Sequence, residues 1–332
     1  MNSKLKIVNS KLKVAVLAGG IGAEREVSIE SGRCVAEALK EARLKVITAD
    51  ITPDNTEILE DAGIDVFFPA LHGRFGEDGR LQQILEDRSL LYTTSGPAAC
   101  KMAFDKIAAK KLFAQAGIDV PAAIEFSSDT DIGELEDRLR QLADRYVVKP
   151  VRQGSSVGVA IVTEQCEVIN AAQKCLGEFG DCMIEEFVPG REITVGILFD
   201  RPLPIIEVRT KRPFYDYQAK YIDKQTQFLF DTITNPQLAA KIKKMAMDCF
   251  KMLGCRYFAR ADFILSDKQK AYILEVNTIP GLTTHSLLPK AAAKAGISMS
   301  RLCTKIIEAA LESKNQISKS VLEQSEEIKM QR

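Results

Sequence analysis

Hydrophobic residues in the first hundred positions follow two alternating patterns. Continuous apolar runs in KVAVLAGG (13–20), KVITADI (45–51) and DVFFPALHG (65–73) predict strands, whereas EVSIESGRCVAEALKEA (26–42) carries apolar residues at helical spacing. Strands that alternate with helices indicate an open, mostly parallel sheet, in which ligands gather at the carboxyl ends of the strands.

The pattern changes after residue 100. A basic amphipathic helix is predicted over 101–121, ending at Gly117 and Pro121, and it marks a domain boundary. Strands are expected within RYVVKPV, VAIV and CMIEEFV, followed from residue 191 by mainly antiparallel sheet. Helices are predicted near 237–253 and 299–312, and a polar, loosely helical tail follows.

Two of the later strands form a predicted hairpin. YFARADFIL (257–265) and AYILEVNTIPG (271–281) are separated by a short polar segment. A two-residue loop at Lys268 and Gln269 would bring residues 260–262 opposite 275–277.

This register places chemistry-bearing side chains in pairs. Asp262 would face Glu275, and Arg260 would face Asn277, all on one side of the sheet. Two carboxylates about 5 Å apart repel by about 3 kcal/mol at an effective dielectric of about 20, so a positive charge is expected between them. Oxygen ligands without Cys or His indicate Mg²⁺ or Mn²⁺. An exposed acidic hairpin is the alternative.

The composition narrows the class of protein. A chain of 332 residues, 46% hydrophobic and 27% charged, suggests a soluble protein of two or three domains. The 45 basic and 45 acidic residues give no net charge, which argues against nucleic-acid binding and favours small-molecule partners.

Eight cysteines without C-x-x-C spacing fit a reduced cytoplasm. The apolar run Val14–Ala18 is too short for a signal peptide, and no segment reaches membrane-spanning length.

Two segments place charged residues at the ends of strands. KPVRQGSSVG (149–158) sets Lys149 at a strand end before a loop of small residues whose N–H groups can surround phosphate oxygens, although it lacks the Walker A pattern. A hairpin turn is the alternative. Glu185 and Glu186 end an apolar strand and Glu192 follows a turn, where surface charge is the simpler interpretation.

A glycine-rich turn leaves a dehydrogenase open. GGIGAEREVS (19–28) links a strand to a helix and offers an anion-binding helix N-terminus. In a G-x-G-x-x-G dinucleotide fingerprint the third glycine would stand where Arg25 does, while Asp50 lies where a ribose-binding acid would. The two histidines, His72 and His285, both fall in glycine-punctuated loops.

The segment 210–231 is expected to be a lid. It contains Phe214, Tyr215, Tyr217 and Tyr221 beside Lys220, and a long aromatic loop in a compact enzyme usually closes over a site. A buried structural loop is the alternative.

The chain resembles the D-alanine:D-alanine ligases of the ATP-grasp superfamily in the order and spacing of six segments: GGIGAEREVS, ALHGRFGEDG, KPVRQGSSVG, YDYQAKY, ARADF and EVNTIPGLTTHS. The resemblance covers about residues 13–312. It implies an α/β and α+β multidomain protein, with an ATP-grasp fold preceded by a Rossmann-like N-terminal domain.

The expected domains follow from this resemblance. They are a disordered leader (1–12), an N-terminal Rossmann-like substrate domain (13–100), a central ATP-grasp domain (101–190), a C-terminal ATP-grasp domain with the metal site and the lid (191–312), and a polar tail (313–332).

The resemblance also implies an ATP site. Adenine would meet Glu185, Glu186, Phe187 and Val188, and the ribose would meet Glu192. The phosphates would meet Lys106, Lys149, Lys220, Gly154, Ser155 and Ser156, and two Mg²⁺ or Mn²⁺ ions would be held by Asp262, Glu275 and Asn277.

The reaction implied is ATP-dependent joining of two D-alanine molecules through D-alanyl phosphate. The dipeptide product would be a precursor for peptidoglycan synthesis, which maintains cell shape. Glu24 would bind the first ammonium, His72 would lie near that substrate, and Ser286 would help hold the second carboxylate. Arg260 and the N–H of Gly281 would meet the oxyanion, and Ser155 and Tyr221 would join Glu24 in a latch.

Further expectations are a cytoplasmic homodimer and no contact with nucleic acid or membrane. Ile279 departs from the small polar residue common in the family. A nicotinamide dehydrogenase has no use for the acidic hairpin, and a non-catalytic ATP-binding protein would be expected to have lost Arg260, Glu275 or the lid.

Overall fold

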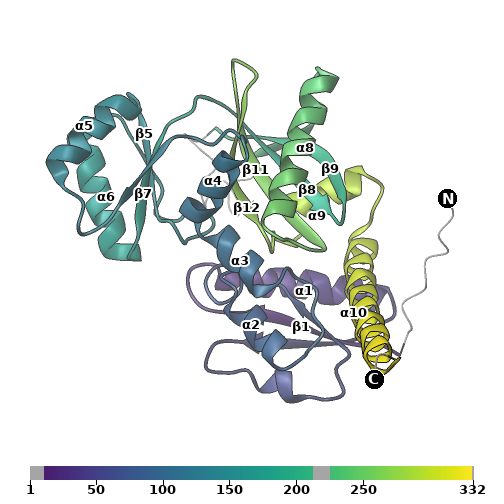
Figure 1. The fold of residues 1–332 in the computed structure, drawn as a ribbon. Helices are drawn as coiled ribbons and strands as arrows, with labels where there is room; N and C mark the ends of the chain where they lie inside the picture. Colours follow the sequence, from purple (N-terminus) through teal and green to yellow (C-terminus); the bar gives the residue numbers. More distant parts are fainter. Residues whose placement is uncertain (1–10, 212–224, 331–332) are drawn as a thin grey trace.

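Three separate β-sheets organise the chain (Figure 1). The computed structural model describes residues 11–211 and 225–330, with the side chains of the last helix described to residue 316. The sheets follow one another along the sequence as N-terminal, central and C-terminal, and we use these names below.

The N-terminal sheet is parallel, as the alternating pattern predicted, with strand order β2-β1-β3. Val14 to Leu17 of β1 are fully buried, because helices and loops cover the sheet. The elements are β1 (Lys13–Gly19), α1 (Arg25–Glu41), β2 (Lys45–Ile51), the 3₁₀ helix η1 (Glu57–Glu60), β3 (Val66–Pro69) and α2 (Arg80–Asp87).

The central sheet has the order β4-β7-β5-β6, and its pairs are antiparallel. Helices α5 and α6 lie together at its outer side (Figure 1), where Leu135, Leu139, Val168 and Ala172 pack into its core. The elements are β4 (Ala123–Phe126), α5 (Ile132–Leu142), β5 (Tyr146–Lys149), β6 (Ala160–Val162), α6 (Gln165–Phe179) and β7 (Cys182–Glu186).

The C-terminal sheet is antiparallel, with order β10-β9-β8-β11-β12, and has a separate core on each face. One core includes α8, whereas the other merges with the core of the N-terminal sheet through α9 and α10. The elements are β8 (Gly190–Leu198), β9 (Arg201–Arg209), β10 (Gln227–Phe230), α8 (Pro236–Met252), β11 (Phe258–Ser266), β12 (Ala271–Asn277), α9 (Leu287–Lys294) and α10 (Met299–Met330).

The β11–β12 hairpin has the predicted pairs but not the predicted loop. Ser266 pairs with Lys270, so the loop has three residues and ends at Gln269 in the left-handed region (φ 59°). That loop alone would shift the register by one residue. A β-bulge at Leu274 shifts it back, so that Asp262 faces Glu275 as expected.

The predicted helix at 101–121 is wrong as a single element. It is divided at Asp105 into α3 (Pro97–Phe104) and α4 (Lys106–Gln115). Asp105 accepts a hydrogen bond from the N–H of Ala108 at 2.9 Å and thus caps α4. The break gives α4 a direction of its own, between the central and C-terminal sheets (Figure 1).

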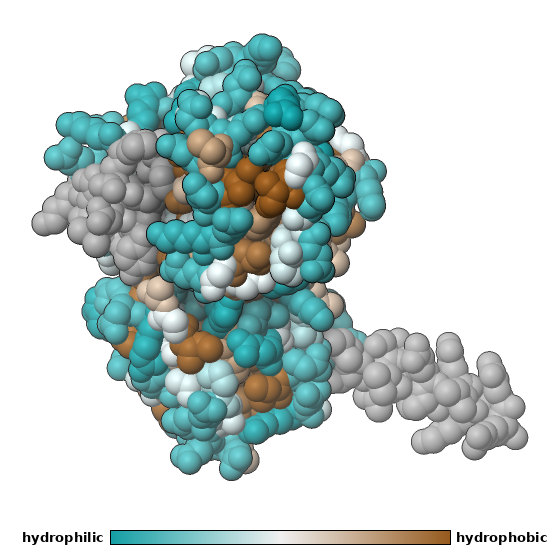
Figure 2. Space-filling model, turned by 90° about the vertical axis from the view of Figure 1, so that its left-hand side faces the viewer, coloured by the Kyte–Doolittle hydropathy of each residue, from teal (hydrophilic) through white to brown (hydrophobic). Residues whose placement is uncertain are grey.

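The predicted helix near 299–312 and the helical tail expected after it form one continuous helix, α10 (Met299–Met330). In the described part of the chain no helix is long and apolar enough to cross a membrane. All eight cysteines are free thiols. On the face in Figure 2, hydrophobic residues gather in small patches framed by hydrophilic ones.

Candidate functional site

Two adjoining cavities lie where the three sheets meet, and they share Lys106, Gln153, Gly154 and Glu275. The nucleotide cavity, as we call it, lies between the central and C-terminal sheets, and its lining includes Lys149, Ser156, Glu185, Glu186, Phe187, Val188, Glu192 and Asp262. The substrate cavity borders the N-terminal sheet, and its lining includes Glu24, His72, Glu77, Ser155, Arg260, Asn277, Gly281, His285 and Ser286.

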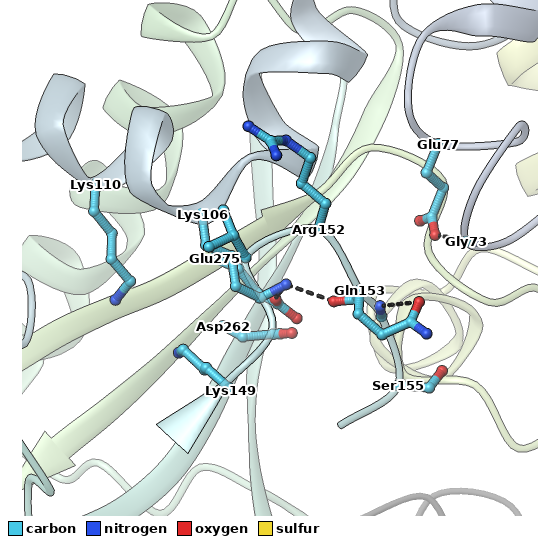
Figure 3. Close-up of polar contacts among 12 residues, drawn as sticks. Gly73, Glu77, Lys106, Lys110, Lys149, Arg152, Gln153, Ser155, Asp262 and Glu275 are labelled. Carbon is cyan, nitrogen blue, oxygen red and sulfur yellow. Dashed lines mark hydrogen bonds and ion pairs between the residues drawn. The ribbon is translucent and has the colours of Figure 1, made fainter. Parts of the chain in front are cut away.

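Lysines and carboxylates alternate along the nucleotide cavity. Glu185, at the end of β7, is 2% exposed and lies 2.6 Å from the ammonium of Lys149 and 2.7 Å from that of Lys110. Lys106 lies 3.2 Å from Glu275 and donates a hydrogen bond to the Gln153 carbonyl at 2.6 Å. Figure 3 shows Lys110 and Lys149 extending toward one another and Lys106 beside Glu275.

Burial and charge set the protonation of this cluster. Burial lowers the pKa of Lys110 to about 8, and only the nearby carboxylates oppose that effect. Burial alone would raise the pKa of Glu185, but Lys110 and Lys149 outweigh it, so the pKa lies below its usual value and the carboxylate is ionised. Sequence reasoning missed Lys110, because a lysine on an amphipathic helix usually points to solvent.

The adenine-binding strand predicted by the resemblance borders the same cavity. The carboxylate of Glu186 accepts a hydrogen bond from the N–H of Ala122 at 3.0 Å, and the Arg145 guanidinium lies 3.9 Å from the centre of the Phe187 ring. These contacts fix the strand where it leaves the sheet.

The facing carboxylates of the hairpin have cationic partners in the structure. Arg260 donates to both oxygens of Asp262, at 2.8 and 2.7 Å, and the Thr194 hydroxyl donates to the same carboxylate at 2.6 Å. The positive charge expected near Asp262 and Glu275 is therefore supplied by Arg260 and Lys106.

The donor set fits a hard divalent cation bound together with phosphate. No group of three or more His, Cys, Asp or Glu side chains placed to hold a metal occurs within the described ranges. Asp262 and Glu275 are two carboxylates at the nucleotide cavity, which is the number that Mg²⁺ usually takes when phosphate oxygens complete its shell. The carboxamide oxygen of Asn277 accepts from the Ile279 N–H at 2.9 Å and keeps a second lone pair.

The small-residue loop after β5 joins the central sheet to the N-terminal domain. Ser155 and Ser156 both have left-handed backbones (φ 51° and 58°), which turns the loop sharply between the two cavities. The Ser155 hydroxyl donates to the carboxylate of Glu24. A Cβ at Gly154 would lie 2.7 Å from that same carboxylate, so glycine permits the close approach.

Residues after β12 shape the substrate cavity. The Ser286 hydroxyl lies 2.9 Å from that of Thr283 and accepts from its N–H at 3.1 Å. A Cβ at Gly281 would lie 2.6 Å from the Ser286 hydroxyl oxygen, so a side chain there would displace Ser286. Ile279 is fully buried and contributes its carbonyl rather than its side chain.

His72 is a buried, neutral link between the N-terminal and C-terminal parts. Its Nδ1 lies 3.0 Å from the Ile279 carbonyl, which can only accept, so Nδ1 carries the proton. Its Nε2, 2.9 Å from the Ser31 oxygen, then accepts from that hydroxyl. Burial lowers the pKa of His72 to about 4. His72 therefore lines the substrate cavity as a positioned neutral ring rather than a cation.

The buried ring predicts an acid-sensitive fold. Because the folded pKa lies below the ordinary value of about 6.5, the unfolded chain binds the proton more tightly, and His72 destabilises the fold as pH falls from 6.5 toward 4. Between pH 7 and pH 5 we expect His72 to cost about 2 kcal/mol of the free energy of unfolding. Denaturant titrations of the wild type and His72→Asn at both pH values measure this. Equal losses in the two proteins would contradict it.

Glu77 is a second site residue that sequence reasoning missed. It is 6% exposed, and its carboxylate accepts from the N–H of Gly73 at 2.6 Å. Burial, followed by the charge of Glu24, raises its pKa well above the usual value. Glu24 and Glu77 therefore line one cavity close enough for the charge of one to act on the other, and an acidic pair of this kind suits a cationic ligand.

The dinucleotide alternative fails on geometry. The Arg25 guanidinium donates to Asp50 at 2.9 Å and to the Gly20 carbonyl at 3.0 Å. Arg25, which stands in place of the third glycine, thus hydrogen-bonds to the glycine turn and to Asp50, the acid that would bind a ribose. Phe214, Tyr215, Tyr217, Lys220 and Tyr221 of the expected lid lie outside the described residues. The end of the same segment is not a lid but strand β10, which pairs with β9.

The arrangement defines the class of the protein. A central and a C-terminal sheet that enclose a cavity lined by lysines and carboxylates, preceded by a parallel sheet, form the ATP-grasp fold expected from the sequence. Residues 112–308 match the family described as "D-ala D-ala ligase C-terminus".

Relatives agree with this class. The chain is 41% identical over 299 residues to the D-alanine–D-alanine ligase of Syntrophotalea carbinolica, covering 90% of this chain and 96% of that protein. The solved D-alanine–D-alanine ligase of Bacillus anthracis complexed with ATP superposes with a TM-score of 0.81 at 34% identity, covering 92% of this chain and 99% of that one. VanG D-Ala:D-Ser ligase from Enterococcus faecalis gives 0.79 at 27% identity, covering 90% and 99%. The chain belongs to the D-alanine–D-alanine ligase family.

Proposed function

We propose that this protein joins two D-alanine molecules at the expense of ATP, giving D-alanyl-D-alanine, ADP and phosphate. One observation carries the proposal. Lys106 and Glu275 stand at the junction of two cavities, with the nucleotide strand on one side and Glu24, Arg260 and Gly281 on the other. A phosphoryl group at this junction would reach a carboxylate in the substrate cavity.

ATP would occupy the nucleotide cavity. Adenine would lie along Glu185 to Val188, the ribose near Glu192, and the phosphates near Lys106, Lys149, Lys220 and the loop Gly154, Ser155 and Ser156. Glu185 borders this cavity with its carboxylate paired to Lys149 and Lys110, which keep it ionised as an acceptor for the amino group of adenine.

Asp262, Glu275 and Asn277 would hold two Mg²⁺ or Mn²⁺ ions. When bound, these ions neutralise phosphate charge and orient the triphosphate. Lys106 would then leave Glu275 for a phosphate, since the structure holds it at the junction of both cavities.

The substrate cavity supplies the remaining groups. Glu24 would bind the first ammonium, and the carboxylate of that D-alanine would attack the γ-phosphorus, releasing ADP and forming an acyl phosphate. The amine of a second D-alanine, oriented by Ser286, then attacks the acyl carbon and loses a proton as phosphate leaves. Arg260 and the Gly281 N–H would stabilise the oxyanion, and Ser155, Glu24 and Tyr221 would hold the lid closed over the site.

The dipeptide would serve cell-wall precursor synthesis in the cytoplasm. We propose the homodimer as the working assembly, and the domain limits given above as the division of the chain.

The decisive experiment measures ADP release with ATP, Mg²⁺ and either D- or L-alanine, and identifies the product by mass. D-Alanine is expected to release ADP at least about a hundredfold faster than L-alanine, because Glu24 would fix the ammonium and Arg260 with Gly281 the carboxyl group, while the cavity wall at His72 would limit the methyl group of the same chiral centre. ADP release that is equal with both enantiomers, or absent with both, would refute the proposal.

A further inference from the structure

Helix α4 connects the two sheets of the nucleotide cavity through two lysines one helical turn apart. Lys106 lies 3.2 Å from Glu275 of β12, whereas Lys110 lies 2.7 Å from Glu185 of β7. The ammonium of Lys110 also donates to the Ile273 carbonyl of β12 at 3.4 Å. Figure 1 shows α4 between the central and C-terminal sheets, so one buried side chain contacts both.

Glu185 has two cationic partners that differ in position. Lys149 lines the nucleotide cavity together with Glu185. Lys110 is not part of that lining and instead lines an adjoining hollow on the same face of the central sheet, with Val120, Met183 and Arg138. Lys149 is therefore the partner of Glu185 that borders the nucleotide cavity and can turn to a ligand there.

A single counterion would create a conflict. Glu185 is 2% exposed, and a carboxylate this deeply buried without a partner costs several kcal/mol. If Lys149 were its only partner, any movement of Lys149 toward a phosphate would strand the carboxylate, and nucleotide binding would be opposed by that cost.

Resting on the proposed function, we propose that Lys110 is a positioning residue for nucleotide binding. It stays with Glu185 as a permanent counterion, which lets Lys149 turn from that carboxylate to the phosphates of ATP. Lys110 touches no substrate itself and acts through Glu185 and Lys149.

The charges of the cluster support this division of roles. Burial, together with the charge of Lys149 and against the pull of the carboxylates Glu185 and Glu275, lowers the pKa of Lys110 to about 8. Lys110 is therefore mainly protonated at neutral pH, and departure of Lys149 would remove a charge that lowers its pKa. Glu185, Lys149 and Glu275 are the charged groups acting on it from the packed strands.

The first test compares Lys110→Met with Lys111→Met. Lys111 is the next residue of α4, but its side chain is 69% exposed and pairs only loosely with Glu125 at 3.7 Å. Calorimetry with MgADP should give a Kd about tenfold or more weaker for Lys110→Met and unchanged for Lys111→Met. The KM for D-alanine should stay within about twofold of the wild type in both. An unchanged Kd for MgADP in Lys110→Met would overturn the proposal. So would a rise in the KM for D-alanine as large as the rise in the Kd for MgADP.

The second test introduces Lys110→Met into protein that already carries Glu185→Gln. In a Glu185→Gln background no charge remains to be neutralised, so Lys110→Met should alter the MgADP Kd by less than about twofold. A purely structural role for Lys110 would preserve the full effect in that background and refute the proposal. This pair remains informative even if Lys110→Met alone does not fold. Wild-type protein that fails to bind MgADP would instead refute the proposed function.

Discussion

Glu275→Gln is expected to lower kcat by at least about a hundredfold at saturating ATP, D-alanine and Mg²⁺. Glu275 faces Asp262 across the hairpin and stands at the junction of the two cavities. A carboxamide keeps the shape of the side chain but removes the anionic oxygen that a hard divalent cation prefers. The loss should therefore fall on the chemical step and on the apparent affinity for Mg²⁺.

The same change should hardly affect folding. Two bare carboxylates would repel, and removing one would stabilise the protein; but the structure pairs Asp262 with Arg260, and Glu275 with Lys106. We therefore expect no stabilisation, and a loss of no more than about 1 kcal/mol, because Lys106 keeps its bond to the Gln153 carbonyl.

Steady-state ADP release and thermal unfolding without metal measure both parts of this prediction. Asp267→Asn is the matched control, since it makes the same charge change in the exposed loop of the same hairpin. A kcat within fivefold of the wild type for Glu275→Gln would remove Glu275 from the proposed metal site.

The hairpin shows how a sequence can predict the correct strand pairing from an incorrect loop length. Alternation along the strands placed Asp262 and Glu275 on one face, and the pairing followed from an assumed two-residue loop. The real loop has three residues, and the bulge at Leu274 offsets the difference. The residue types around Leu274 do not predict a bulge, because Leu fits a regular strand as well as it fits a bulged one.

Helix α4 shows a different limit. Asp105 is a good N-cap residue and could have signalled the break, but the helical spacing of apolar residues continues across it from α3 into α4. Once the break is placed, Lys110 faces the interior between two sheets. Its partner Glu185 lies 75 positions away in the chain, and local pattern does not contain such long-range pairing.

Glu77 was missed for a related reason. It stands among Gly73, Asp78 and Gly79 in a polar, glycine-rich loop, which resembles an exposed turn. The structure buries its carboxyl group against the N–H of Gly73 and close to Glu24. The parallel sheet and the antiparallel C-terminal sheet, by contrast, were predicted correctly, because period and apolar runs within each segment suffice for them.

Arg260→Lys is expected to lower kcat/KM for D-alanine by about a hundredfold while leaving the Kd for MgADP within about threefold. Lysine keeps a positive charge beside Asp262, so the buried carboxylate remains paired and the protein should fold. It loses the planar fork that lets Arg260 contact both oxygens of Asp262 and still present donors to the substrate cavity.

A fall in kcat/KM for D-alanine without a change in the Kd for MgADP distinguishes a role at the reacting carbonyl from a role in the fold, because a structural defect would disturb both cavities. Initial rates over a range of D-alanine concentrations, with calorimetry of MgADP binding, supply the two numbers. If kcat/KM for D-alanine and the Kd for MgADP worsen together, or if kcat/KM for D-alanine falls less than fivefold, then Arg260 serves mainly as the counterion of Asp262. The oxyanion must in that case be stabilised by Gly281 and its neighbours alone.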